Sequence, residues 1–166
     1  MDNTQTEVSP TSDRRMIASR VIDTPAALVF NAWTEPKQLG QWWGPADAQT
    51  SVHEMDVVPD GVTRLAVRGS DGTEHLVKLV YTDIQAARLL SYTQSEDVGS
   101  DEDAAAFSVT VHFEDQGQQQ TRITMQTVFR SATERDRAVN GVGAATGADQ
   151  LLERLAKFLQ DFLPSH

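Results

Sequence analysis

Apolar and polar positions divide the chain into a middle part with strand periodicity and a final part with helix periodicity. Between residues 50 and 128, short alternating runs are separated by turn signals about every ten residues, which predicts an antiparallel meander. In the clearest run, residues 107–113, apolar side chains alternate inward with polar ones outward. We expect seven strands: two between residues 50 and 71, and the others over residues 15–23, 74–83, 88–94, 105–114 and 121–129.

Two short helices are expected between the first and second strands. Apolar residues recur at helical spacing at Leu28, Val29, Ala32 and Trp33. Proline disfavours helical geometry in the residue before it, so Glu35-Pro36 interrupts this helix, and Gly44-Pro45 closes a second one. The result is a compact helical pair.

The last predicted element, residues 132–163, is helical, and its apolar face changes in size along its length. Large residues recur every three or four positions in its second half, at Leu152, Leu155, Leu159 and Phe162. Traced backwards, the same stripe meets only Ala148, Ala144 and Gly141. Protein interiors pack densely, so a stripe made of such small residues needs an explanation. Either another backbone segment approaches the helix closely there, or a hollow is left. We expect a short helix to about residue 139, a break, and a long helix from about residue 143 that covers the sheet.

Length and local composition predict one domain with a loose leading segment. The 166 residues suffice for a single core. Residues 1–13 are polar, include Pro10 and show no period, which predicts a disordered tail. The expected domain therefore covers residues 14–163.

Charge and cysteine content exclude several functional classes. With 24 acidic and 14 basic side chains, the net charge of -10 repels phosphate backbones and anionic lipid surfaces. The absence of cysteine excludes disulfides, zinc thiolate sites and a thiol nucleophile. No apolar run has the length of a membrane span or a signal peptide. We expect a cytoplasmic monomer or weak homodimer, without nucleic-acid partners or membrane insertion.

Motifs for catalysis, metals and cofactors are sparse. The histidines show no metal-ligand spacing, and the common hydrolase, dinucleotide and nucleotide motifs are missing, so we expect no metal and no cofactor. The acidic segment 96–103 lacks the ligand spacing of a calcium loop and is interpreted as a solvated hairpin tip. His53 and Tyr81 lie on strands whose parity is open: they are wall residues, or alternatively a general base and a donor.

Seven short motifs occur in an order and spacing typical of one family. They are NAWTEP (31–36), QWWGP (41–45), EMD (54–56), PDG (59–61), RGSDGTE (68–74), RD (135–136) and QLLERL (150–155). Together they resemble the activator-of-heat-shock-protein-ATPase-homologue group of the START-like (SRPBCC, birch-pollen-allergen-like) superfamily of bacterial and other proteins, over about residues 14–162. The resemblance implies an α+β helix-grip fold, in which a curved seven-stranded antiparallel sheet wraps around a long C-terminal helix and encloses a hydrophobic cavity.

The expected cavity lining combines the inward strand positions with the helical pair and the small face of the last helix. One ring of Trp42-Trp43 is expected to plug the core, while the other edges the cavity or joins the core. The predicted ligand-binding residues are Trp33, Trp43, Met55, Val57, Leu65, Val67, Tyr81, Tyr92, Phe107, Val109, Met125, Ala144, Ala148 and Leu152.

Two positions depart from the family pattern. Family members often carry an aromatic residue where this chain has Thr63, and a Gly-Trp pair where it has Gly147-Ala148. A tryptophan buries roughly 150–250 Å², so these two losses either enlarge the cavity or let the helix collapse inward.

Three functional classes follow. The first is binding of a small apolar molecule, such as a lipid, a polyketide or an aromatic metabolite, in the internal cavity. The second, which the resemblance implies, is an enzyme of the polyketide cyclase or dehydratase kind, with His53 and Tyr81 as its catalytic pair. The third is a co-chaperone that stimulates a heat-shock-protein ATPase. We favour binding without turnover because the sequence has no recognisable nucleophile, metal set or oriented base.

Overall fold

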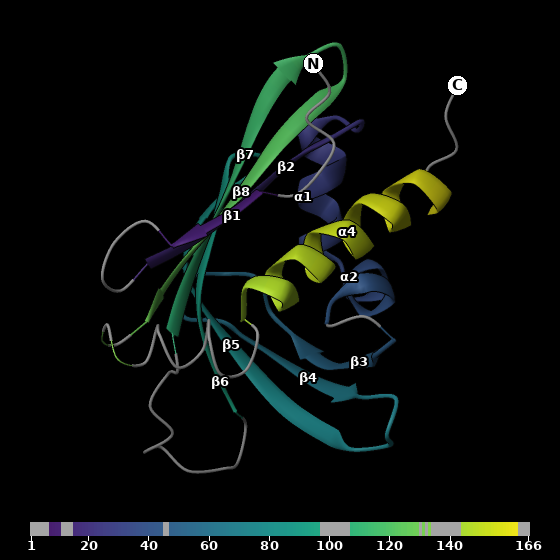
Figure 1. Ribbon diagram of the computed structural model, residues 1–166, viewed down its shortest axis with the longest axis vertical. Helices are drawn as coiled ribbons and strands as arrows, with labels where there is room; N and C mark the ends of the chain where they lie inside the picture. The colour runs from purple at the N-terminus through teal and green to yellow at the C-terminus, as the bar shows by residue number, and fades with distance from the viewer. Residues whose placement is uncertain are drawn as a thin grey trace.

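In the part of the chain that the structure describes, one antiparallel sheet is combined with two short helices and one long helix (Figure 1). The computed structural model describes residues 7–10, 15–44, 47–96, 107–129 and 144–162, with the single positions 131 and 133. The strands are β1 (Glu7–Pro10), β2 (Arg15–Ile22), β3 (Gln49–Met55), β4 (Val62–Arg68), β5 (Glu74–Gln85), β6 (Leu89–Glu96), β7 (Phe107–Gly117) and β8 (Gln120–Phe129). The helices are α1 (Ala26–Thr34), α2 (Pro36–Trp42) and α4 (Ala144–Phe162).

Strands β3 to β8 form a meander, and β8 then pairs with β2, the first long strand. The order of the sheet is β1-β2-β8-β7-β6-β5-β4-β3, and every neighbouring pair is antiparallel. The seven strands and the two helices between the first and second of them are confirmed, as is the start of the long helix near residue 143. The short helix and break expected over residues 132–143 lie outside the described part of the chain.

The expectation of a disordered tail over residues 1–13 is wrong for residues 7–10. These residues form β1, an eighth strand that pairs with β2 from Glu7↔Ser19 to Pro10↔Met16. A four-residue segment with Val8 as its one aliphatic side chain gives no periodic signal of its own, so local pattern missed a strand that an existing sheet edge stabilises. In Figure 1, β1 lies along β2, and the backbone of β1 also approaches α4.

Removal of residues 1–13 is therefore expected to destabilise the protein. Loss of the β1 ladder is expected to cost about 1–2 kcal/mol, or roughly 2–8 °C of melting temperature for a domain of this size. Removal of residues 1–6 alone keeps β1 and serves as the control. Differential scanning calorimetry of both truncations would contradict the role of β1 if their melting temperatures agreed.

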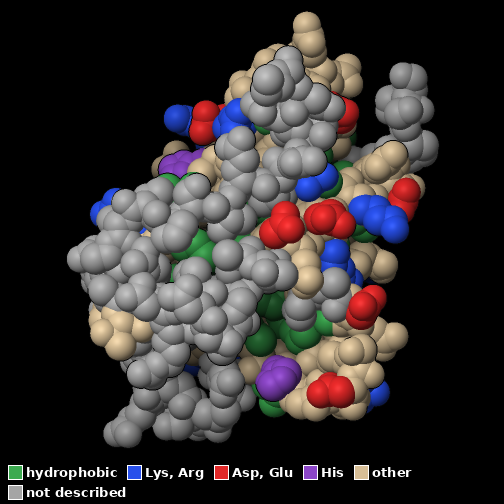
Figure 2. Space-filling model, viewed as in Figure 1, with side chains coloured by type: hydrophobic (Ala, Val, Ile, Leu, Met, Phe, Trp, Pro, Cys, Tyr) green, Lys and Arg blue, Asp and Glu red, His purple; other side chains and the backbone are tan. Residues whose placement is uncertain are grey.

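The long helix α4 crosses the inner face of the sheet and packs beside the helical pair (Figure 1). Leu152, Leu155 and Leu159 are fully buried on one side of the helix. Its outer side carries exposed charges, among them Glu153 and Lys157, and Figure 2 shows charged side chains gathered along this surface. Within the described residues, no helix combines the length and apolar character that crossing a bilayer requires.

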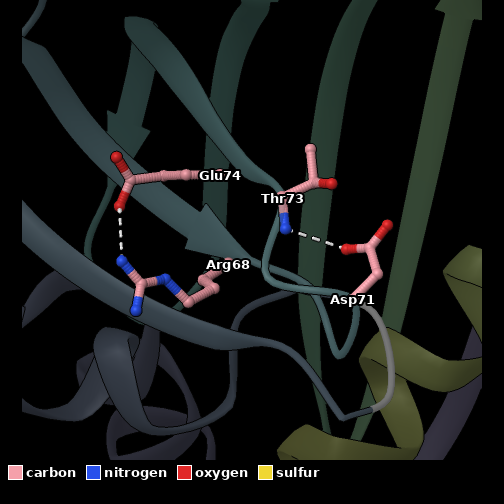
Figure 3. Close-up of polar contacts among 4 residues, drawn as sticks. All are labelled: Arg68, Asp71, Thr73 and Glu74. Carbon is pink, nitrogen blue, oxygen red and sulfur yellow. Dashed lines mark hydrogen bonds and ion pairs between the residues drawn. The ribbon is translucent and has the colours of Figure 1, made fainter.

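Polar side chains stabilise the turn between β4 and β5. At the β4–β5 turn, Asp71 accepts a 2.9 Å hydrogen bond from the Thr73 backbone N–H, and Arg68 lies 3.9 Å from Glu74 across the strands (Figure 3). The hydrogen bond lowers the pKa of the exposed Asp71 carboxyl group. The RGSDGTE motif is thus a hairpin that fixes the register of β4 on β5.

Candidate functional site

The candidate site is the interior between the inner face of the sheet, the helical pair and α4. The aromatic and aliphatic side chains there form one continuous buried cluster. Its helical roof is held by Trp42, whose indole Nε1–H donates a 3.1 Å hydrogen bond to the Ala32 carbonyl oxygen and so fixes α2 against α1.

Most of the predicted lining residues converge on this interior. Nine are buried in the cluster: Trp33, Trp43, Leu65, Val67, Tyr81, Tyr92, Val109, Met125 and Leu152. Met55, Val57, Phe107 and Ala148 are half-buried and pack against it. The side chain of Ala144 lies outside the part that the structure describes. Contact of these residues with a ligand stays a prediction.

Aromatic rings form a chain through the middle of the interior. The ring centroids of Trp33 and Trp42 are 4.8 Å apart at 72°, an edge-to-face pair. Tyr92 lies 6.4 Å from Trp33 on one side and 6.4 Å from Tyr81 on the other. Both rings of Trp42-Trp43 are buried, and Trp42 is the one that closes the helical pair.

Thr63 and Tyr81 form a buried polar pair that the sequence did not reveal. Their hydroxyl oxygens are 2.6 Å apart, and the two residues are 0% and 1% exposed. Thr63 stands where family members often carry an aromatic ring, so the Tyr81 hydroxyl rather than a void meets this position. Burial raises the pKa of Tyr81, an effect that the hydrogen bond between Tyr81 and Thr63 only partly offsets.

Thr63→Val is expected to lower the free energy of unfolding by about 1–3 kcal/mol, because it leaves the Tyr81 hydroxyl buried without a partner. The double variant Thr63→Val/Tyr81→Phe removes both hydroxyls and is expected to recover most of the loss. Urea denaturation of the two variants and of Tyr81→Phe completes the cycle. Additive losses would contradict a direct interaction between the hydroxyl groups.

The three indole N–H groups of the interior differ in how they are satisfied. Trp42 donates to the Ala32 carbonyl, whereas Trp33 Nε1 and Trp43 Nε1 are buried without a hydrogen-bond partner. Burial raises the pKa of Tyr92 above its usual range, Tyr81 adds to the rise, and Trp43 opposes it. Trp43 therefore lies near the Tyr92 hydroxyl, but its N–H does not meet it with hydrogen-bond geometry.

The alternative that made His53 a cavity residue is wrong. His53 is exposed, and the β3–β4 register shifts between Val52 and Glu54, which makes His53 the extra residue of a β-bulge. A bulge changes the side to which side chains point, and alternation alone does not foresee it. Tyr81 is buried in the interior cluster, whereas His53 is exposed, so the structure does not bring the two side chains together in the interior.

Metal-ligating side chains do not gather in the described residues. No group of three His, Cys, Asp or Glu side chains there could hold a metal ion. The acidic segment 97–103 lies outside the described residues.

An open groove of about 390 Å³ lies on the surface between α2 and α4. Gln41, Arg154, Lys157, Phe158 and Asp161 line it. Arg154 donates 3.2 Å hydrogen bonds to the carbonyl oxygens of Gly44 and Ala48, which tie the segment after α2 to α4. Partial burial lowers the pKa of Arg154, against an opposing effect of Asp47.

Comparison with known families decides the affiliation. Residues 23–160 match the family described as activator of Hsp90 ATPase homolog 1-like protein (AHSA1). The chain belongs to the AHSA1 family. The match includes α1, α2, α4 and strands β3–β8, so it covers nearly all the elements that enclose the interior. No curated protein matches the chain closely enough to add a relative of established function.

Solved structures confirm the fold of this AHSA1 family member. A Mycobacterium smegmatis protein has a TM-score of 0.82 at 20% identity, over 95% of this chain and 98% of its own. An Arthrobacter aurescens protein has a TM-score of 0.83 at 20% identity, over 93% and 91% of the two chains. The AHSA1 protein of Silicibacter pomeroyi has a TM-score of 0.71 at 17% identity, over 89% and 99%. At these identities the likeness establishes the α+β helix-grip fold alone.

Proposed function

We propose that this protein binds a small apolar molecule in the interior between the sheet and α4. The observation that carries the proposal is the change from large to small side chains along the inner face of α4. Leu152 and Leu155 on this face are 0% exposed. One turn earlier, Ala148 also packs against the core, yet it is only half-buried.

This difference supports binding because Ala148 offers the core a smaller side chain than the leucines that follow it on the helix. Alanine lacks the branched end of leucine, and a core position that keeps accessible surface leaves contacts unmade. The half-buried apolar residues Met55, Val57 and Phe107 add further surface for a guest. Ligand sites are mostly apolar with a few polar groups, which is the composition of this interior.

The described residues favour neither alternative function. An acid–base enzyme of the cyclase or dehydratase kind needs its base within reach of the substrate, and His53 is exposed on a bulge. The raised pKa of Tyr81 and its bond to Thr63 suit a buried structural hydroxyl. For stimulation of a heat-shock-protein ATPase, the support is the description of the family. The proposal is therefore confined to binding, in a cytoplasmic monomer or weak homodimer.

Binding of N-phenyl-1-naphthylamine, a neutral apolar dye, tests this function. We expect saturable fluorescence enhancement with one dye per chain, and native mass spectrometry of freshly purified protein is expected to show any co-purified molecule as a mass increase lost on denaturation. The variant Lys157→Ala, altered at an exposed position of the open groove, serves as the control and is expected to bind like the wild type. Failure of the wild type to saturate would contradict the proposal, and loss of binding in Lys157→Ala would assign it to the surface groove.

A further inference from the structure

Two indole N–H donors in the interior make no hydrogen bond of good geometry with a protein acceptor. Trp33 and Trp43 are 2% and 6% exposed, and neither indole N–H finds a hydrogen-bond partner. Buried polar groups are normally paired, since an unpaired donor loses its hydration without a replacement. Trp42, in the same cluster, follows the rule with its bond to Ala32. The exceptions are therefore specific to the two indoles that do not serve the packing of α2 on α1.

The two unpaired indoles lie beside the same residue. Tyr92 is 6.4 Å from Trp33 between ring centroids, and Trp43 acts on its hydroxyl group. Trp33 comes from α1, Trp43 follows α2 and Tyr92 belongs to β6, so three parts of the chain bring these side chains together in one apolar cluster. An indole N–H donates only, whereas a phenol donates or accepts. The region therefore has more donors than acceptors.

We propose that the guest of this interior is an apolar molecule with a neutral oxygen acceptor, the carbonyl of a ketone, ester or amide, which accepts a hydrogen bond from Trp33 or Trp43 beside Tyr92. This inference rests on the proposed function, because it names the chemical class of the ligand for the same interior. A carbonyl oxygen has two lone pairs and supplies what the region lacks. Its apolar remainder contacts the rings and aliphatic side chains around it.

A neutral acceptor fits the site better than a carboxylate. The buried polar residues among those described are Thr24, Thr63, Ser95, Thr121 and Thr127, and none carries a charge. A buried carboxylate without a cationic partner loses far more hydration than two indole donors return. The raised pKa of Tyr92 has the same cause, because burial there disfavours a negative charge.

Matched ketone and alkene probes test the proposal. Acetophenone and α-methylstyrene have nearly the same shape and differ in C=O against C=CH₂, as do benzophenone and 1,1-diphenylethylene. Each is titrated into protein labelled with ¹⁵N at the indole nitrogens. We expect each ketone to bind about two- to tenfold more tightly than its alkene, the effect of one hydrogen bond. The Nε1–H signal of Trp33 or Trp43 is expected to move downfield with ketone only, while Trp42, already bonded to Ala32, provides the internal control.

Variants and outcomes separate this inference from the proposed function. Trp33→Phe and Trp43→Phe keep an aromatic ring and remove the donor, so at least one is expected to lose the preference for ketone while its alkene affinity is retained. If either variant fails to fold, the signals of the wild-type protein still decide. Equal binding of ketone and alkene with unmoved indole signals would overturn the inference alone and assign the donors to resident water. Tighter binding of benzoate than of the ketones would overturn the assignment of a neutral acceptor. Failure of all five probes to bind would contradict the proposed function as well.

Discussion

Replacing Ala148 with tryptophan is expected to abolish saturable binding of N-phenyl-1-naphthylamine while the protein stays folded. Ala148 packs against the core and is only half-buried, one turn before the fully buried Leu152. A tryptophan side chain buries roughly 150–250 Å². At this position it would lie against the surface that the guest would otherwise contact. Dye titration followed by fluorescence, with circular dichroism as the check on folding, measures the effect.

The matched control is Glu153→Trp, which places the same side chain on the exposed side of α4. It is expected to bind dye like the wild type. Unchanged binding in a well-folded Ala148→Trp variant would place the guest away from this face of the helix. A loss of about 1–3 kcal/mol or more of stability would instead mean that the core has no space there for a larger side chain.

Gly61→Ala is expected to lower the free energy of unfolding by about 3 kcal/mol or more, the upper range of overpacking effects. A methyl group on Gly61 would overlap the Asp56 carbonyl oxygen and lie 2.9 Å from the Val58 carbonyl oxygen. Both are backbone atoms, so no rotamer change relieves the contact. The Gly61 N–H donates to Val58 at 2.7 Å and its carbonyl accepts from the Tyr81 N–H at 3.0 Å, so a shifted turn also disturbs β5.

Gly72→Ala distinguishes this steric effect from backbone strain. Gly72 has a φ of +85° but no atom within 4 Å of an added methyl group. Its replacement is expected to cost about 1–2 kcal/mol through the left-handed conformation alone. Guanidinium denaturation of both variants measures the difference. Equal losses would contradict the assignment of the Gly61 effect to contact with the Asp56 and Val58 carbonyls.

The fold followed from the sequence wherever periodicity and turn residues agreed. Alternation over residues 107–113 predicted β7, and the leucines of α4 predicted its buried side. β1 was missed because its formation depends on pairing with β2, not on a pattern of its own. Local sequence records the preferences of a segment but not the partner that stabilises it.

The sequence predicted the candidate site less completely than the fold. Alternation placed Val109 inward, and the predicted lining also included Tyr81 and Tyr92; all three are buried. It could not assign His53, because one extra residue in β3 changes the parity. Nor did it show that Thr63 pairs with Tyr81, or that Trp42 is satisfied while Trp33 is not. Hydrogen-bond partners depend on distances between segments far apart in the chain, and the type of residue alone does not give them.

The bulge at His53 also affects how molecules of this protein meet one another. A sheet that does not close has two edges, here β1 and β3, and an unpaired edge is a template for strands of other chains. The extra residue in β3 breaks the regular spacing of donors and acceptors along one edge. At the other edge, β1 has only four residues and ends in Pro10, which has no N–H to donate. Both edges thus resist edge-to-edge aggregation. We therefore expect the protein to stay dispersed at high protein concentration although its sheet is open.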